Sequence, residues 1–242
     1  MPSGPAVPPL SVSIIIPTFN EGGHIGQLLD HLRGLGGGGK TVEIVVADGG
    51  STDGTAAEAA ARGARVVPCP RKGRAVQLNH GAAHATGQIL YFLHADTHPP
   101  ATLLPDLREA VAAGYGSGCY RLRFDEPHWF LRANAWFTRF NVEAVRYGDQ
   151  SLFARAEVFR RAGGYREELL VFEDQEITRR LRQQGPFRVL PNYIVTSARK
   201  YRENGVYRLQ GVFLLLNVLY RLGAPQPRLA DLYRRLVRSD KL

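Results

Sequence analysis

The chain has 242 residues, of which 44% are hydrophobic and 22% charged. This is the composition of an ordinary globular protein, and a chain of this length can bury a core without disulfides or a structural metal. Disordered, collagen-like and coiled-coil proteins are therefore excluded. Two cysteines, Cys69 and Cys119, are present, and the first residues lack the basic region and long apolar run of a signal peptide. We expect a reducing, cytoplasmic location.

The chain is strongly basic, with 31 Lys and Arg against 22 Asp and Glu and a net charge of +9. Such a balance favours nucleic acid, an anionic membrane or a phosphorylated substrate as the partner. The charge is unevenly spread, however. Residues 1–120 carry 8 basic and 9 acidic side chains, whereas residues 179–242 carry 14 basic and 3 acidic ones. The basic excess therefore belongs to the C-terminal part of the chain.

The first part of the chain alternates between short apolar runs typical of buried strands and segments with helical spacing. The predicted strands are residues 12–16, 42–47, 65–67 and 89–93. The predicted helices between them are residues 25–32, 52–62 and 74–85. This alternation is typical of βαβ units, so we expect an α/β fold with a mainly parallel sheet flanked by helices. Ligands of such sheets bind at the carboxyl ends of the strands, which directs attention to residues 17–23, 48–54 and 94–98.

Beyond residue 100 the pattern becomes less regular. The expected helices here are residues 102–113, 128–140, 173–184, 206–222 and 228–237, and residues 119–124 alternate like a half-buried strand. The apolar run 212–216 is too short to span a bilayer. We see no internal repeat or linker, and we therefore expect a loose leader (1–10), one catalytic domain (11–200) and a basic amphipathic helical extension packed on or beside it (201–242).

Acidic side chains follow the predicted strands. Asp53 is expected to cap the next helix, whereas Asp48 is expected to meet a ligand because Gly49 and Gly50 leave room for close approach. Asp96 ends a strand, and its hard oxygens suit Mg²⁺ or Mn²⁺ bridging substrate phosphates. His94 would point the same way, because strand side chains alternate.

Two further clusters carry opposite charges. Arg71, Lys72 and Arg74 surround a glycine at a helix start, where an anion would be favoured, although a solvated basic turn would look the same. Glu173 and Asp174 begin another helix. They either compensate the helix dipole or supply a general base for an acceptor hydroxyl, and spacing alone leaves both interpretations open.

Taken together, these segments resemble glycosyltransferase family 2, whose members share the GT-A nucleotide-sugar fold. The matching pieces, in chain order, are IIIPTFNE (14–21), ADGGSTDGT (47–55), KGRA (72–75), HAD (94–96) and ED (173–174). Each piece is common, but the ordered set is specific. The variants DGGS, GRAVQLN and LHADT resemble a small bacterial subfamily associated with radical-SAM enzymes and arsenosugar biosynthesis.

The resemblance implies roles for individual residues. It places the donor nucleotide against Pro17, Asn20, Glu21, Asp48, Arg71 and Arg74. It places the acceptor near Asp149, Gln150, Gly163, Gly164 and Glu173. Asp174 matches the catalytic base of the family's Glu-Asp motif. Asp96 stands at the last position of the Asp-x-Asp metal motif, and His94, which replaces the usual first Asp, is a second candidate ligand.

The implied activity is transfer of a sugar from a nucleotide-diphosphate donor, expected to be a UDP-sugar, to a hydroxyl of a small-molecule or lipid acceptor. Mg²⁺ or Mn²⁺ at Asp96 would neutralise the leaving diphosphate, and Asp174 would remove the acceptor proton. One base and one displacement imply inversion at the anomeric carbon.

Several alternatives remain. A sugar nucleotidyltransferase would share the architecture, but it would have a basic glycine-rich loop directly after the first strand. This chain has the acidic segment 17–21 at that position. Nucleic-acid binding is not expected, since no zinc-ligand spacing or RNA-recognition motif is present. The C-terminal helices would cover the sheet, form a homodimer contact or lie on the inner face of a membrane beside a lipid acceptor. The aromatic residues of segment 128–140 are expected in the core or an interface, with a sugar-stacking face as the alternative.

Overall fold

The computed structural model describes residues 10–36, 41–142 and 148–238. Its centre is one eight-stranded mixed sheet in the order β3-β2-β1-β4-β7-β6-β8-β5. The strands are β1 (Val12–Thr18), β2 (Val42–Asp48), β3 (Arg65–Pro68), β4 (Ile89–Phe92), β5 (Thr97–His98), β6 (Ser117–Phe124), β7 (Leu152–Arg155) and β8 (Phe187–Thr196). The four strands predicted in the first part of the chain, β1 to β4, are all present. β1 pairs in parallel with β2 and β4, and β2 pairs in parallel with β3.

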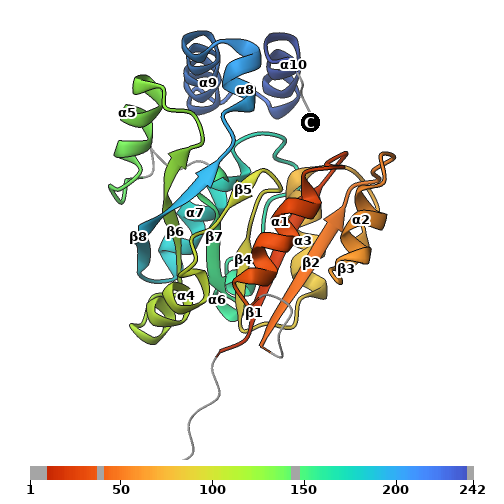
Figure 1. Cartoon of the computed structure of the whole chain (residues 1–242). Helices are drawn as coiled ribbons and strands as arrows, with labels where there is room; N and C mark the ends of the chain where they lie inside the picture. The colour runs from red at the N-terminus through yellow and green to blue at the C-terminus, as the bar shows by residue number, and fades with distance from the viewer. Residues whose placement is uncertain (1–9, 37–40, 143–147, 239–242) are drawn as a thin grey trace, which may run out of the picture.

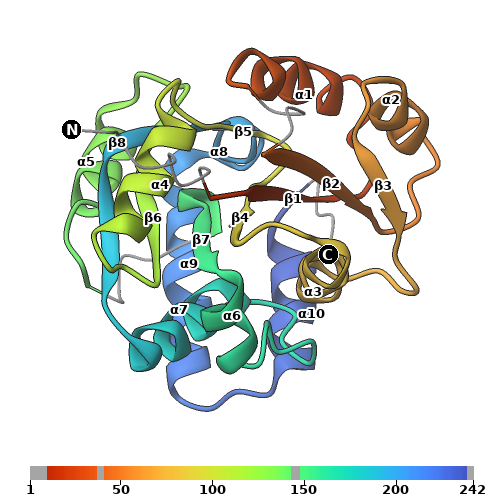
Figure 2. The same cartoon turned by 90° about the horizontal axis from the view of Figure 1, so that it is seen from below.

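Helices cover both faces of this sheet, as Figure 2 shows. They are α1 (Ile25–Gly34), α2 (Thr55–Ala61), α3 (Arg74–His84), α4 (Leu103–Ala112), α5 (Trp129–Phe137), α6 (Ala156–Arg161), α7 (Glu173–Gln184), α8 (Arg199–Asn204), α9 (Val206–Arg221) and α10 (Gln226–Leu236). A short 3₁₀ helix spans Gly148–Gln150. On β1, Ile14 and Ile16 face the core beneath α1 and α4, while Ile15 faces the core beneath α3, α6 and α7. The apolar run of this strand is thus explained by burial on both faces.

The second half of the sheet departs from a purely parallel arrangement. β7 pairs antiparallel with β4 and β6, and β5 pairs antiparallel with β8. β8 was not predicted from the sequence. Its pairing with β6 shifts register between Tyr120 and Arg121, where Pro191 and Asn192 of β8 are left unpaired, so the strand lacks a regular alternation.

The last three helices pack together at the end of the molecule to which β8 leads (Figure 1). Leu209, Val212 and Leu216 of α9 form a separate small core with Leu229 and Tyr233 of α10. α9 and α10 lie within residues 201–242, the segment expected to be a helical extension, and the division of the chain into domains stays a prediction. The expected leader falls largely on residues 1–9, which lie outside the described residues. Within those residues, no helix combines the length and apolar character needed to cross a membrane.

The aromatic segment around α5 was expected in the core or an interface. Trp129, Trp136, Phe137 and Phe140 are exposed in the structure, which excludes the core and leaves the interface as a prediction. Leu131 and Ala135, on the other side of α5, make its buried face. The aromatic residues of this helix therefore do not serve the core of the chain.

Candidate active site

Two loops at the carboxyl edge of the sheet are hydrogen-bonded to each other. Asn20 Oδ1 accepts from the Thr52 amide at 2.9 Å, and Ser51 Oγ accepts from the Asn20 amide at 2.9 Å. Thr55 Oγ1 accepts from the Glu21 amide at 2.8 Å. Asn20 has a positive φ of 51°, a conformation that asparagine tolerates better than most residues. The loops after β1 and β2 thus form one continuous rim.

Asp48 and Asp53 organise this rim. Asp48 is buried, and its Oδ2 accepts from the amides of Gly50 and Ser51 at 3.1 and 2.9 Å, while Oδ1 accepts from Thr18 Oγ1 at 3.1 Å. Asp53 accepts from the Thr55 amide, but the N-cap residue of α2 is Gly54, so Asp53 holds the turn before the helix and the predicted cap is wrong. Asp48 is the last residue of β2, and its predicted contact with a nucleotide stays a prediction.

Gln77 on α3 holds the ends of β1 and β2 together. Its Nε2 donates to the Thr18 carbonyl at 2.7 Å and to the Ala47 carbonyl at 3.0 Å. A Cβ added at Gly49 would lie 3.0 Å from this amide, so the glycine allows Gln77 to reach the strand ends. Gln77 lies within the sequence motif GRAVQLN, but no role could be predicted for it, since a buried amide leaves no periodic signal.

The basic segment 71–74 lies over the same edge. Arg71 pairs with Glu167 at 2.5 Å, and the Lys72 ammonium lies 3.9 Å from the centre of the Phe19 ring. Arg74 opens α3 and reaches across to α7, where its Nη1 lies 3.2 Å from Glu173 Oε1 and 3.5 Å from Asp174 Oδ2. The two oppositely charged motifs of the sequence are therefore one cluster.

Within this cluster Glu173 is 3% exposed, and burial raises its pKa despite the neighbouring Arg74 charge. The carboxylates of Glu173 and Asp174 raise the pKa of Arg74. Phe172, immediately before α7, has a positive φ of 67°, which turns the chain sharply into the helix. After this turn Glu173 is buried at the wall of the cavity, and Asp174, 18% exposed, is more open to it.

His94 and Asp149 form a second pair beside Asp174. His94 Nδ1 lies 3.6 Å from Asp149 Oδ1. Burial lowers the pKa of His94, but the neighbouring carboxylates of Asp149 and Asp174 outweigh it, so the pKa lies above its ordinary value. Burial likewise raises the pKa of Asp149, but His94 and the positive charges of Lys200 and Arg74 bring it below its ordinary value.

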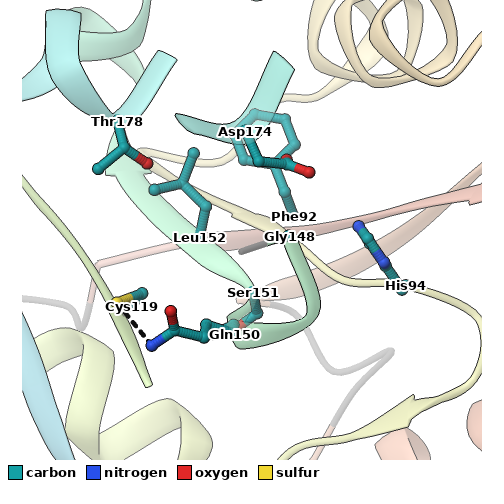
Figure 3. A pocket seen from close by; sticks show the side chains of 9 residues that line it. All are labelled: Phe92, His94, Cys119, Gly148, Gln150, Ser151, Leu152, Asp174 and Thr178. Carbon is teal, nitrogen blue, oxygen red and sulfur yellow. Dashed lines mark hydrogen bonds between the residues drawn. The ribbon is translucent and has the colours of Figure 1, made fainter. Parts of the chain in front are cut away.

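Gly148 separates His94 from Asp174. Figure 3 shows the Asp174 carboxylate and the His94 ring directed into the same space. A Cβ on Gly148 would collide with Asp174 Oδ2 and lie 3.0 Å from His94 Cε1. Gln150, two residues on, donates to the Tyr120 carbonyl at 3.0 Å and lines a small cavity of about 10 Å³ with His94 and Asp174. Gln150 is therefore a buried residue that lies next to His94 and Asp174 and is held by its hydrogen bond to β6.

A cavity of about 620 Å³ joins these groups. The predicted site residues that line it are Pro17, Glu21, Arg71, Arg74, His94, Asp96, Asp149, Glu173 and Asp174. A cavity of this size holds a ligand of several rings. Residues predicted from five separate segments of the sequence thus line one space.

The structure does not bring Gly163 and Gly164 to this cavity. Both have positive φ, 82° and 67°, and their amides bond back to the Arg160 and Phe159 carbonyls at the end of α6. A Cβ on Gly164 would lie 2.8 Å from Asn79 Oδ1. Their observed place is a helix end, and their predicted part in acceptor binding has no contact to support it.

Asp96 is the candidate metal ligand. Its Oδ1 accepts from Thr97 Oγ1 at 3.2 Å, and its backbone carbonyl accepts from the Ser197 amide at the end of β8 at 3.1 Å. No group of three or more His, Cys, Asp or Glu within the described ranges could hold a metal ion. One carboxylate fits Mg²⁺ or Mn²⁺ that takes its other ligands from substrate phosphates and water, which is how Mg²⁺ is commonly held.

The helical extension contributes residues that the sequence analysis missed. Arg199 and Lys200 of α8 and Arg234 of α10 line the cavity. The Lys200 ammonium donates to the Tyr233 hydroxyl at 3.1 Å. Burial lowers the pKa of Lys200, but the interactions with Tyr233, and to a smaller extent the charge of Asp149, outweigh it, so the pKa lies above its ordinary value. The basic excess after residue 178 was the available signal, but its side chains could not be assigned to the cavity before the helices were folded over it.

Comparison with known proteins agrees with this geometry. The model of glycosyl transferase family 2 matches residues 13–169, well over half of the chain. The chain belongs to this family. The resemblance of its sequence motifs to this family is thereby confirmed.

Its curated relatives match over parts of their length. The chain is 34% identical to glucosyl-3-phosphoglycerate synthase of Mycolicibacterium smegmatis over 37% of this chain and 32% of that protein. It is 29% identical to the succinoglycan biosynthesis protein ExoA of Rhizobium meliloti over 71% of this chain and 58% of that protein. The glycosyltransferase therefore spans between a third and about three fifths of the length of these relatives.

Solved structures share its fold. The mannosyltransferase PcManGT of Pyrobaculum calidifontis, solved with GDP-Man and Mn²⁺, superposes with a TM-score of 0.71 at 22% identity over 96% of this chain and 73% of that chain. S. aureus TarS, solved with UDP-GlcNAc, gives a TM-score of 0.65 at 19% identity over 78% and 58% of the two chains. The expected GT-A fold is confirmed.

Proposed function

We propose that this glycosyltransferase moves a sugar from a nucleoside-diphosphate donor, a UDP-sugar, to an acceptor hydroxyl with inversion at the anomeric carbon. The observation that carries the proposal is the single cavity of about 620 Å³ lined by the rim of the β1 loop, by Asp96 and by Asp174. Donor, acceptor and base can thereby meet in one space, as a direct displacement requires.

The donor nucleotide is proposed to lie against the rim. Pro17 and Glu21 line the cavity, and Asn20 and Asp48 hold the loop behind them. Arg71 and Arg74 reach the same space, and Arg guanidinium groups bind phosphate through two hydrogen bonds. Two solved structures support a uridine donor: a glucosyl-3-phosphoglycerate synthase with UDP and Mn²⁺, and TarS with UDP-GlcNAc. PcManGT was solved with GDP-Man, so a guanosine donor is the alternative to be tested.

Asp174 is proposed as the general base. It lies at the start of α7 with 18% of its side chain exposed, open to the cavity, while its neighbour Glu173 is buried against Arg74. A positioned carboxylate that takes the proton of an attacking hydroxyl contributes about 10²–10⁴-fold to the rate. One base on the acceptor side supports a single displacement, and hence inversion.

Asp96 is proposed to hold the divalent cation together with the donor, with His94 nearby as the second candidate ligand. When bound, such an ion supplies Lewis-acid stabilisation of the leaving diphosphate. Lys200 and Arg199, which also line the cavity, are proposed to add fixed positive charge for the same diphosphate.

Two measurements on the intact protein test the proposal. Thermal shift with UDP, GDP and their sugars, each with and without Mn²⁺ or Mg²⁺, should show stabilisation by a uridine nucleotide that increases with metal. Asp174→Asn should abolish nucleoside-diphosphate release from the sugar donor and leave donor binding intact. Asp30→Asn, on the exposed surface of α1, is the matched control and should keep full activity. Absence of any nucleotide shift, or full turnover by Asp174→Asn, would contradict the proposal.

The narrower resemblance, to the subfamily associated with radical-SAM enzymes and arsenosugar biosynthesis, is carried by the motifs DGGS, GRAVQLN and LHADT. We propose that the acceptor is of the kind used by this subfamily. A small-molecule acceptor of this kind would be recognised by side chains on the Asp149 side of the cavity. The cytoplasmic location likewise stays a prediction of the sequence.

A further inference from the structure

Helix α9 is apolar on two sides. One side, with Leu209, Val212 and Leu216, is buried against α10. The opposite side is exposed, with side-chain exposures between 44% and 78% at Tyr207, Leu214, Leu215, Val218 and Leu222. The spacing of these residues places them on one stripe of the helix. A continuous exposed apolar stripe of this kind commonly marks an interaction site.

Helix α5 carries a similar stripe. Trp129, Trp136, Phe137 and the following Phe140 are exposed by 44% to 66%, and their spacing repeats that of the first four residues of the α9 stripe. Leu131 and Ala135 on the other side hold α5 to the sheet domain. The exposed aromatic residues therefore do not contribute to the packing of this helix against the sheet domain.

The two stripes are connected. The rings of Trp129 and Tyr207, both exposed, lie with centroids 6.4 Å apart, and Phe130 contacts the same tyrosine at 5.2 Å. Asn134 Nδ2 donates to Gln210 Oε1 at 3.2 Å further along the helices. Figure 1 shows α5 and α9 at the same end of the molecule. We refer to the two stripes together as the α5–α9 face.

The charges on these helices are all positive. Neither α5 nor α9 contains Asp or Glu, whereas Arg132, Arg208 and Arg221 are exposed on them. Another arginine, Arg139, lies 4.4 Å from the Trp136 ring. The nearest acidic residues in sequence are Asp125 and Glu126, which are bound to Arg202 at 3.7 and 3.1 Å, and the exposed Glu203, which precedes α9 by three residues.

We propose that the α5–α9 face docks on the surface of an anionic lipid bilayer. Tryptophan, tyrosine and leucine on one side and arginine around them are the residues that hold an amphipathic helix in the plane of a membrane surface. A second copy of this chain fits less well. In a twofold contact the arginines would face their own copies without an acidic partner, whereas lipid phosphates and carboxylates neutralise them.

The face also borders the cavity. Phe137, exposed on α5, lines the cavity together with Asn134 and with Gln210 of α9. A docked molecule would therefore hold this side of the cavity near the lipid headgroups, where a lipid acceptor could enter. This consequence rests on the proposed glycosyl transfer, whereas docking itself does not.

The two tryptophans of the chain both belong to this face, so their fluorescence reports on it alone. With vesicles that contain phosphatidylglycerol we expect a blue shift of the emission and co-flotation of the protein, both reduced by salt. Phosphatidylcholine vesicles should give little of either. Loss of Arg221 by Arg221→Gln should weaken binding about fivefold, and the pair Leu214→Ser and Leu222→Ser about tenfold or more.

The matched control is Tyr193→Ser, which removes an exposed aromatic side chain on β8 outside the face and should bind vesicles as the parent does. Equal binding to both vesicle types, or no blue shift, would overturn the proposal. A stable dimer in sedimentation that shields the tryptophans without lipid would assign the face to a second copy. Nucleotide thermal shift in the same variants should be unchanged, so a failure of docking is distinguished from a failure of the proposed transfer.

Discussion

The ring of Phe172 lies stacked on that of Tyr220, with the two centroids 4.8 Å apart. Phe172 has a left-handed backbone conformation that non-glycine residues seldom adopt unless the surroundings enforce it. The stacked Tyr220 ring helps to hold Phe172 in this conformation. Because Tyr220 belongs to α9, the helical extension holds the turn from which Asp174 projects.

We expect Tyr220→Ala to lower the turnover number more than it weakens donor binding. An aromatic pair contributes about 0.5–1.5 kcal/mol beyond the area it buries, and its loss would let the start of α7 relax. Steady-state kinetics with separate nucleotide binding by calorimetry checks this split. Tyr220→Phe keeps the ring and should recover the turnover that Tyr220→Ala loses. Equal losses in binding and turnover would show that the stack does not act through Asp174.

The Gly148 position gives a second prediction. A methyl group there collides with Asp174 Oδ2 and crowds His94, so one of these side chains must move. Gly148→Ala should therefore reduce transfer at least about tenfold, since misplacement of a catalytic group by about 1 Å costs up to 10²-fold. Gly34→Ala, where no atom lies within 4 Å of the new Cβ, is the control and should keep activity. An active Gly148→Ala would mean that Asp174 tolerates displacement.

Much of the first half of the fold could be predicted from the sequence. The apolar run at residues 12–16 is buried on both faces, which makes such a strand easy to recognise, although β1 continues through Pro17 to Thr18. The second half could not be predicted as fully. β7 and β5 have 4 and 2 residues, too few for a periodic signal, and β8 contains Pro191 at its register shift.

The candidate site shows a similar division. Acidic residues after strands could be assigned to the carboxyl edge by topology alone, and Asp96 and Glu21 do line the cavity there. The contact of Arg74 with Glu173 joins residues almost a hundred positions apart, and only packing of α3 against α7 reveals it. Lys200 was missed for the same reason, since its place depends on how α8 folds over the edge.

The Glu43 carboxylate gives a prediction for stability in acid. Burial alone would raise its pKa, but hydrogen bonds from Ser13 and Thr86 outweigh it, so the pKa lies below its ordinary value. A carboxylate with a lowered pKa stabilises the fold above its ordinary pKa, and that contribution is lost as the pH falls through the folded-state value. Glu43→Gln should lower the free energy of unfolding at neutral pH by about 1 kcal/mol, and with it the Tm. In acid the Tm of the variant should converge with that of the parent. Parallel Tm curves across the acid range would contradict this.

The Arg74–Glu173 pair has the opposite pH dependence. Burial raises the pKa of Glu173, so its protonated form favours the fold; this stability is fully present below the ordinary pKa and is lost as the pH rises through the folded-state value. The guanidinium of Arg74 limits the loss by stabilising the carboxylate. Arg74→Gln should therefore destabilise the protein by about 1–3 kcal/mol at neutral pH and by less in acid.

A double-mutant cycle separates this pairing from other roles of Arg74. Glu173→Gln removes the buried charge, so the double variant Arg74→Gln and Glu173→Gln should recover most of the stability lost in Arg74→Gln alone. Denaturant unfolding at neutral and acid pH measures the coupling. Additive effects at neutral pH would mean that Arg74 stabilises the fold through Asp174 instead, since its Nη1 also lies 3.5 Å from that carboxylate.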